Sequence, residues 1–265
     1  MVETPAPPVD DPTAPGTPRR ERPGLELVTV LLVSLGMSGI YALLSIVRSE
    51  LTVVGGVGNT TATVVSGEST VHPVLDLLDD LADILHGLAP PLLALVLLAR
   101  WPGGPGFGIG FDLRRRRELL QGVGFLALIG IPGLGLVYLA HLTGANASLQ
   151  VVNFPDVWYR IPYLLLSAFQ NGLAEEVVVV GFMLTRLAQL GWSRERSLIA
   201  SATLRGSYHL YQGFGGFAGN FVMGLIFGWW FQRTRRVVPL VVAHTLLDAV
   251  SFIGYVYLSP HISWI

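Results

Sequence analysis

The chain lacks cysteine and lysine altogether, and it carries few charged residues of any kind. Without cysteine it has no disulfide framework, no thiol nucleophile and no cysteine-based metal site. Its 17 basic residues are therefore all arginine. Charged residues make up only 13% of the sequence, whereas about 25% is typical of soluble domains. This shortage of charge excludes an ordinary soluble globular domain.

Hydrophobic residues take the place of the charged ones, at 51% of 265 residues and a mean hydropathy of +0.57. A membrane-spanning helix needs about 20 predominantly apolar residues. Stretches of roughly this kind recur along the chain and predict an all-α, polytopic transmembrane helical bundle of seven spans, or eight if 161–190 is broken. The predicted spans are Leu25–Val47, Leu85–Ala99 with its preceding turns, Leu119–Leu142, Ile161–Leu184, Ser197–Tyr211, Phe217–Phe231 and Val237–Leu258.

Arginine clusters alternate with arginine-free loops between these spans. The clusters lie at 19–22, 100–117, 186–196 and 233–236, and the loops without arginine are those around 51–72, 142–157 and 212–216. Cytoplasmic loops carry an excess of basic residues. The alternation therefore predicts a multi-pass protein of the cell membrane with its N-terminus in the cytoplasm.

The sequence divides into three predicted parts. Residues 1–24 contain seven prolines and almost nothing to bury, which predicts a disordered cytoplasmic tail. N-terminal transmembrane helices follow at 25–154. A C-terminal helical core that holds the chemistry occupies 155–265.

One segment, 72–85, is amphipathic rather than apolar throughout. Asp76, Asp79, Asp80 and Asp83 lie on one face of a helix, with leucine and isoleucine opposite. The pattern favours a solvated helix outside the bilayer. It leaves open a role in cation binding or substrate entry.

Ionisable residues are rare in the predicted C-terminal spans, and those that need a partner form three pairs. A charge at membrane depth costs about 2.5–3.5 kcal/mol on insertion scales, so it normally faces a partner or a cavity. Arg186 lies near a span end, from which its side chain can reach the interface. The three pairs are Glu175 with Glu176, Arg205 with His209, and His244 with Asp248.

Helical periodicity predicts how these pairs are oriented. The members of the second and third pairs are four residues apart and share a helix face. Glu175 and Glu176 are about 100° apart on an α-helix, so we expect that they cannot point at the same target. One would face a site and the other would be held by a structural partner. A single intramembrane histidine is more often capped by a neighbouring carbonyl, but three pairs in one stretch favour convergence. We expect Glu175, His209, His244 and Asp248 to line one polar cavity within the bilayer, toward its cytoplasmic half.

The motifs "AEEVVVVG", "RGSYH" and "AHTLLD", in this order and spacing, resemble those of the CPBP family of intramembrane proteases. These are the relatives of the CAAX-prenyl endopeptidase, and the family includes bacteriocin-immunity-like members. The family carries Glu-Glu-x-x-x-Arg, Phe-x-x-x-His and His-x-x-x-Asn/Asp motifs on successive membrane helices. The resemblance covers about 155–258. Each motif is a weak signal alone, and together, within predicted spans, they are a strong one.

Two positions depart from the family pattern. Val180 stands where the family has arginine, and Arg205 stands where it has phenylalanine. An arginine at position 180 would lie one turn from Glu176 and could neutralise it. Arg205 lies one turn before His209 on the next helix, from which it could reach the same carboxylate. We therefore expect a structural ion pair between Arg205 and Glu176.

The resemblance implies an intramembrane endopeptidase that uses a water activated by glutamate and histidine. The candidate catalytic set is Glu175, Glu176, His209, His244 and Asp248. In this interpretation Glu175 and His209 activate the water, His244 and Asp248 stabilise the oxyanion or orient that group, and Glu176 is structural.

A metalloprotease mechanism would use the same residues. Glu175, His209, His244 and Asp248 are acceptable zinc ligands in number and type, so zinc is the cofactor that this set would take. The sequence has no His-Glu-x-x-His motif, and a metal-free glutamate mechanism has also been argued for relatives. We favour a mechanism without an obligatory metal.

Two other functional classes stay open. A transporter or proton relay would need polar residues along a path through both leaflets, and the first three predicted spans offer almost none. A non-catalytic family member, serving in immunity or as a scaffold, would keep the fold while its motifs drift, as Val180 and Arg205 do. The expected partners are membrane lipids and a membrane-embedded or lipid-proximal peptide or protein substrate, with no nucleic acid.

Overall fold

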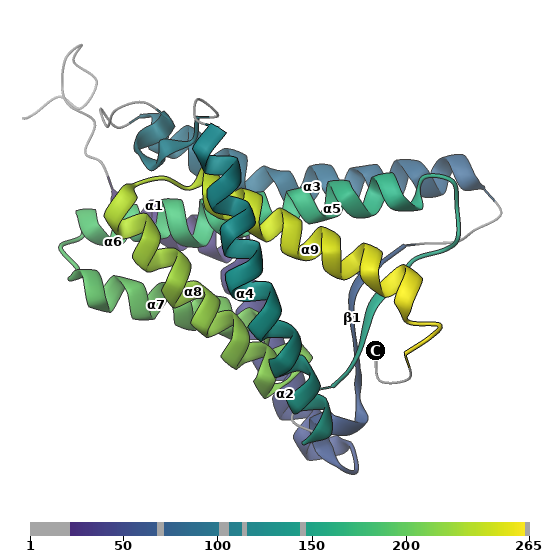
Figure 1. Ribbon diagram of the computed structural model, residues 1–265. Coiled ribbons are helices and arrows are strands. Elements are labelled where there is room, and N and C mark those ends of the chain that lie inside the picture. The colour runs from purple at the N-terminus through teal and green to yellow at the C-terminus, as the bar shows by residue number, and fades with distance from the viewer. Residues whose placement is uncertain (1–21, 68–71, 101–105, 113–115, 144–146, 263–265) are drawn as a thin grey trace, which may run out of the picture.

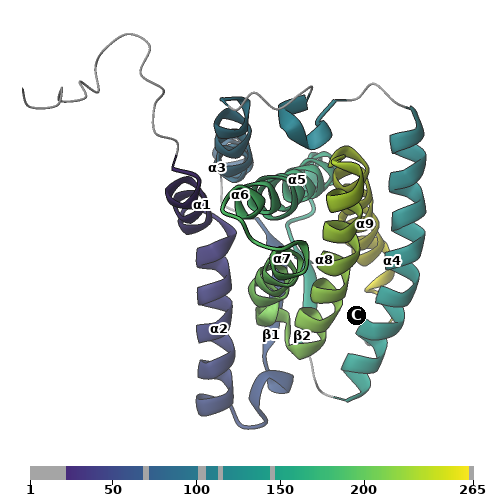
Figure 2. The ribbon, with the colours of Figure 1, turned by 90° about the vertical axis from the view of Figure 1, so that its left-hand side faces the viewer.

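The computed structural model describes residues 22–67, 72–100, 106–112, 116–143 and 147–262. Within them the chain forms nine α-helices, several short 3-10 and π segments, and one ribbon of two strands (Figures 1 and 2). The predicted all-α helical bundle is confirmed, and the ribbon is an addition that hydropathy did not predict. The predicted tail lies outside the described residues, apart from Arg22 and the first residues of α1.

The elements follow one another along the chain with short connections. They are α1 (Pro23–Leu32), α2 (Leu35–Thr52), η1 (Gly56–Asn59), β1 (Thr61–Ser66), α3 (Pro73–Ala99), η2 (Gly106–Gly110), α4 (Arg116–Leu142), β2 (Ser148–Asn153), α5 (Arg160–Glu175), η3 (Glu176–Phe182), α6 (Met183–Gln189), α7 (Arg194–Tyr208), η4 (Leu210–Gln212), α8 (Phe214–Thr234) and α9 (Val238–Leu258).

Five helical segments of the described chain are long and apolar enough to cross a membrane: α3, α4, the continuous helix of α5, η3 and α6, α8, and α9. The first predicted span is broken into α1 and α2, which meet at a bend of 50° and make a sixth candidate together. The predicted span Ser197–Tyr211 corresponds to α7. Its 15 residues cover about 22 Å at 1.5 Å per residue, less than the ~30 Å of a hydrocarbon core.

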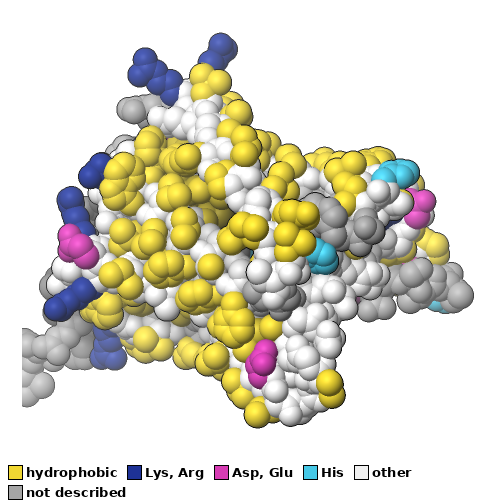
Figure 3. All heavy atoms as spheres, turned by 60° about the horizontal axis from the view of Figure 1, so that its bottom comes forward, with side chains coloured by type: hydrophobic (Ala, Val, Ile, Leu, Met, Phe, Trp, Pro, Cys, Tyr) yellow, Lys and Arg dark blue, Asp and Glu magenta, His cyan; other side chains and the backbone are white. Residues whose placement is uncertain are grey.

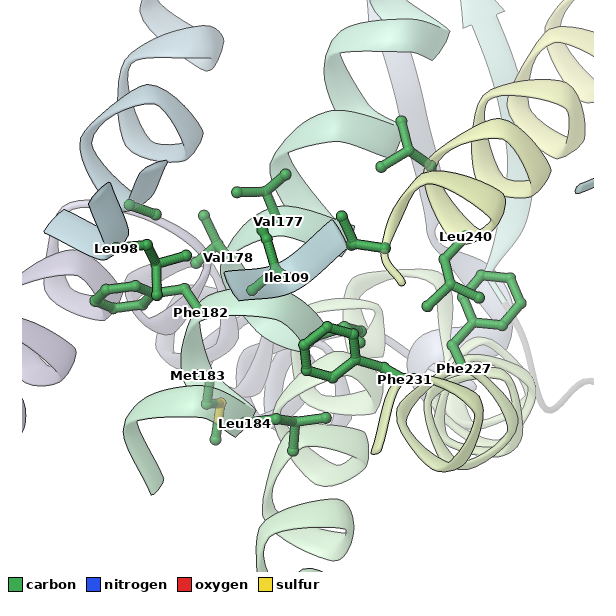
Figure 4. Packing of buried hydrophobic residues seen from close by; sticks show 14 of the residues in the cluster. Leu98, Ile109, Val177, Val178, Phe182, Met183, Leu184, Phe227, Phe231 and Leu240 are labelled. Carbon is green, nitrogen blue, oxygen red and sulfur yellow. The ribbon is translucent and has the colours of Figure 1, made fainter. Parts of the chain in front are cut away.

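The helix at 160–189 runs unbroken through the middle of the bundle, so it is one span rather than two. Its centre, η3, is a π-helix, and every residue from Glu176 to Phe182 is buried. Figure 4 shows its valines between Leu98 of α3 on one side and Phe227, Phe231 and Leu240 on the other. π-Helical turns are rare overall, and the ones that do occur are often found at functional sites. This one follows directly after Glu175.

One end of the bundle, here called the arginine end, is where α3, α6 and α8 finish. Arg186 of α6 pairs with Glu26 of α1, with 2.6 Å between Nη2 and Oε2, and donates to the Leu97 carbonyl (3.0 Å). Arg235, after α8, donates to the Gly108 carbonyl (3.1 Å). In Figure 3 the arginine side chains of the visible face gather at its left and upper margins. The segments that were predicted to share one side of the membrane thus lie together.

The opposite end, here called the ribbon end, holds η1, β1, β2 and η4. The two strands are parallel, with Thr61 beside Ser148. The N–H of Ala147 donates to the carbonyl of Gln212 (3.1 Å), which ties β2 to η4. In Figure 1, β1 runs between the far end of α2 and the far end of α5. The ribbon therefore joins helices that diverge from the arginine end.

The acidic segment is the first part of α3 and not a separate helix. Asp79 and Asp83 are exposed, as a solvated face requires, but Asp76 and Asp80 are buried. The expectation of a fully solvated acidic face is therefore wrong for these two. Asp80 lies near Tyr159, and burial together with its negative charge raises the pKa of the Tyr159 hydroxyl.

Candidate active site

Three helices bring the predicted polar pairs to one place. Glu175 ends α5, His209 directly follows α7, and His244 and Asp248 lie on α9. Gly172 sets the distance between α5 and α9, because a Cβ at this position would lie 2.7 Å from the Thr245 hydroxyl and 2.9 Å from its backbone nitrogen. A larger residue would push the helices apart. Glycine here allows the acidic helix to approach the histidine helix.

Glu175, His209, His244 and Asp248 all line one pocket of about 390 Å³. Binding pockets for small ligands typically measure about 300–1,000 Å³. Helices α2, α4 and α8 and both strands complete the walls. The structure therefore brings the four residues together in a cavity large enough for a peptide segment.

The carboxylate of Glu175 lies at the centre of the group. Its Oε2 accepts a hydrogen bond from the Tyr208 hydroxyl (2.7 Å). The same oxygen lies 3.7 Å from Nε2 of His209 and 4.0 Å from Nε2 of His244. These two separations are too long for direct hydrogen bonds, and they are the kind of gap that a shared water molecule bridges.

Glu176 is held from two sides and is completely buried. Its Oε1 accepts from Nη2 of Arg205 and lies 2.7 Å from Nδ1 of His244. Arg205 is also completely buried, and its guanidinium lies over the Phe227 ring at 5.6 Å from the centroid. The predicted partners Arg205 and Glu176 are thus in contact between α7 and η3, at a depth where neither can reach water.

The expectation that the two glutamates could not meet the same target is wrong. Nη2 of Arg205 lies 3.5 Å from Oε2 of Glu175 as well as in contact with Glu176. His244 likewise faces both acids, through its two different ring nitrogens. The two carboxylates point in different directions from the α5–η3 junction. The long side chain of Arg205 and the two ring nitrogens of His244 each face both of them.

His244 also faces the fourth predicted residue. Its Nε2 lies 3.7 Å from Oδ1 of Asp248, one turn further along α9. The other carboxylate oxygen of Asp248 accepts from the side-chain amide of Asn171 (3.2 Å). The amide fixes the orientation of the aspartate from the facing helix.

Two residues at the site were not predicted, Tyr208 and Asn171. Tyr208 is adjacent to His209 in "RGSYH", and Asn171 lies four residues before Glu175, hence on the same helix face. That spacing was a usable signal for Asn171. Tyr208 could not be found from spacing on α7, because the helix ends at Tyr208 and the following turn redirects the chain.

The zinc alternative depends on how the candidate ligands are grouped. Within the part of the chain that the structure describes, no three histidine, aspartate or glutamate side chains are grouped to hold a metal ion. The metalloprotease alternative is therefore not supported.

Comparison with known protein families matches part of the chain. Residues 157–250 match a family model described as "Rce1-like: Type II CAAX prenyl endopeptidase Rce1-like". The matched segment contains all three motifs and every candidate site residue. No curated protein and no solved structure matches the chain.

Proposed function

We propose that the protein is an intramembrane endopeptidase, because residues 157–250 match the model of the Rce1-like family of type II CAAX prenyl endopeptidases. It hydrolyses a peptide bond of a membrane-embedded or lipid-proximal substrate. The observation that carries this proposal is the position of the Glu175 carboxylate, 3.7 and 4.0 Å from two imidazole nitrogens inside a cavity of the bundle.

Water activation is the first step. A water molecule between Glu175 and His209 would donate one hydrogen bond to each of Oε2 and Nε2, which their separation of 3.7 Å allows. Its oxygen attacks the carbonyl carbon of the substrate while Glu175 takes the proton. General-base catalysis of this kind contributes about 10²–10⁴-fold to the rate.

The charge that develops on the substrate oxygen needs a donor in the same cavity. His244 is placed to supply it, since its Nδ1 is engaged with Glu176 and its Nε2 points into the pocket toward Glu175 and Asp248. Collapse of the tetrahedral intermediate breaks the carbon–nitrogen bond. Glu175 then returns its proton to the leaving amine, so protons balance without another donor.

The remaining residues position these groups. Tyr208 holds Oε2 of Glu175, and Asn171 holds Asp248 beside His244. Arg205 neutralises the buried charge of Glu176, and Glu176 in turn holds Nδ1 of His244. None of these three roles requires contact with the substrate.

The test is cleavage of defined probes by the purified, reconstituted protein. We would use a fluorescence-quenched peptide with a farnesylated CAAX end, the same peptide without lipid, and a quenched single-span peptide. Glu175→Gln and His209→Ala should each lower the rate by about 10²–10⁴-fold. His261→Ala, an exposed histidine beyond α9, is the matched control and should leave cleavage unchanged.

A folded wild-type protein that cleaves none of the probes would contradict the proposal. The non-catalytic alternative, immunity or scaffolding, would then be the better interpretation. Equal loss of activity in His261→Ala and His209→Ala would also contradict it, because the effect would not come from the pocket.

A further inference from the structure

Two polar side chains of the pocket take no part in the proton transfers described above. Tyr211 and Gln212, both of η4, line the pocket together with His209. The rings of His209 and Tyr211 lie 6.4 Å apart between centroids and are inclined to each other by only 23°. The tyrosine therefore lies beside the imidazole that is placed to contact the attacking water.

The two side chains form a hydrogen-bonded unit that has unused capacity. Nε2 of Gln212 donates to the hydroxyl oxygen of Tyr211 (2.9 Å). A phenol hydroxyl can donate one hydrogen bond while it accepts another, and a side-chain amide oxygen is an acceptor. Among the described residues nothing accepts from the Tyr211 hydroxyl and nothing donates to Oε1 of Gln212. The unit therefore offers the pocket a free donor and a free acceptor.

The surroundings hold this unit in place. The backbone N–H of Gln212 donates to the His209 carbonyl (3.0 Å), and the Gln212 carbonyl accepts from the N–H of Ala147 (3.1 Å). Gly216 leaves room for the glutamine side chain, because a Cβ there would lie 2.8 Å from the Cβ of Gln212 and 3.1 Å from its Oε1. The Tyr211 side chain packs against the apolar cluster that includes Ala147. Groups held in this way lose little conformational entropy when a ligand binds.

A donor beside an acceptor matches the main chain of an extended peptide. In an antiparallel sheet, a residue of one strand can exchange both its N–H and its C=O hydrogen bonds with the residue opposite. The opposite residue then supplies one acceptor and one donor. Oε1 of Gln212 and the hydroxyl of Tyr211 supply the same two groups from side chains. The unit can therefore bind one residue of a peptide without reading its side chain.

We propose that Tyr211 and Gln212 bind the main chain of a peptide at one residue and thereby hold a neighbouring peptide bond at Glu175. The Tyr211 hydroxyl donates to the carbonyl of the bound residue, and Oε1 of Gln212 accepts from its N–H. That this peptide is a substrate rests on the proposed function, whereas the main-chain contact itself does not.

The spacing of the rings indicates which residue is bound. An extended chain advances about 3.3–3.6 Å per residue. The rings of Tyr211 and His209 are 6.4 Å apart, which corresponds to about two residues of an extended chain. We therefore expect the bound residue to lie within about two residues of the bond that is cleaved.

Binding is tested separately from cleavage, in the Glu175→Gln variant. Of the three probe peptides, the one that binds most tightly is labelled with a fluorophore and made as a series, each member N-methylated at one backbone nitrogen. Methylation removes one N–H donor. Fluorescence anisotropy gives the Kd of each member. We expect methylation at one position to raise Kd about 2–10-fold, which corresponds to one net hydrogen bond.

Removing the acceptor should remove this sensitivity. With Gln212→Met added to Glu175→Gln, the unmodified peptide should bind about 2–10-fold more weakly, and methylation at the sensitive position should add less than about twofold. Tyr211→Phe should weaken the unmodified and methylated peptides by similar factors, because its hydroxyl faces the carbonyl. Gln121→Met and Tyr257→Phe change exposed residues outside the pocket and are the matched controls, with Kd expected within about twofold.

A methylation effect that is as large in Gln212→Met as in its parent would overturn the proposal, because a merely structural change at 212 weakens all peptides alike. Failure of every probe to bind would overturn it too. Peptides that show the expected pattern but are not cleaved by the wild type would refute the proposed function and leave the main-chain contact standing. Cleavage without the pattern would refute the contact and leave the proposed function standing.

Discussion

Removing the buried charge of Arg205 should destabilise the protein, and removing Glu176 with it should restore part of the loss. The two side chains are in contact and completely buried. Arg205→Met and Glu176→Gln keep the approximate size of each side chain and remove its charge. Each single variant strands the partner in an apolar interior, which typically costs about 3–5 kcal/mol.

The contacts around the pair place each loss toward the lower end of that range. After Arg205→Met, Glu176 keeps His244 at 2.7 Å. After Glu176→Gln, Arg205 keeps Glu175 at 3.5 Å. We therefore expect about 3 kcal/mol from each single substitution. The double variant should lose about 1–3 kcal/mol less than the sum, the usual coupling for residues in contact.

The assay is unfolding of the detergent-solubilised protein by a rising fraction of SDS, followed by tryptophan fluorescence. The double-mutant cycle gives the coupling free energy between the two positions. Arg186→Met with Glu26→Gln provides a second cycle for comparison. Glu26 is partly exposed, at 23% of its side chain, so water can solvate it when Arg186 is lost, and this coupling should be smaller.

Additive losses at 176 and 205, within about 0.5 kcal/mol, would refute the argument, since independent sites behave in this way. The exchange of the family arginine at 180 for the arginine at 205 would then have no energetic basis. A coupling no larger than that of Arg186 and Glu26 would refute the more specific claim that complete burial makes the pair strong.

Three further predictions concern the site and its helix contacts. Tyr208→Phe removes the hydroxyl that holds Glu175 and should lower kcat for a cleaved probe about tenfold with folding intact, and an unchanged kcat would exclude the positioning role. Gly172→Ala should destabilise the protein by about 1–3 kcal/mol through overpacking. At Gly133 a Cβ meets nothing within 4 Å, so Gly133→Ala should be neutral or stabilise the protein by up to about 1 kcal/mol. Equal unfolding midpoints of the two variants would contradict this prediction. Asn171→Leu should lower kcat and leave the unfolding midpoint nearly unchanged, and a parallel loss of both would point to a structural role instead.

Hydropathy and arginine spacing predicted most of the bundle because each long helix carries its own apolar run. The break between α1 and α2 was not predictable, since the apolar run continues through Val33 and the bend depends on packing. The burial of Asp76 and Asp80 was missed for the same reason. Helical periodicity identifies a shared face but cannot say whether another helix covers it.

The ribbon was missed because its signal is not local. The β-branched residues of Thr61–Val65 suit a strand, but their partner lies in a distant connection, with no hairpin turn to mark the pairing. By contrast, the meeting of Glu175, His209, His244 and Asp248 was predictable, because ionisable groups within apolar spans need partners; their catalytic roles stay a prediction. The shared contact of both glutamates with Arg205 was not predictable, because it depends on the long side chain reaching from α7 to the α5–η3 junction.

The ribbon also has a consequence for the order of assembly. Thr63 and Gln150 are 87 residues apart, with the whole of α3 and α4 between them, so β1 waits for its partner while both helices are made and inserted. At a synthesis rate of about 5–20 residues per second, this wait lasts about 4–17 s. During that time β1 is an unpaired strand, and unpaired apolar strands aggregate. Its short length of six residues, with threonine at two positions, limits that hazard. Synthesis of β2 is complete before that of α5 begins, so the ribbon can form before the proposed catalytic carboxylates are in place.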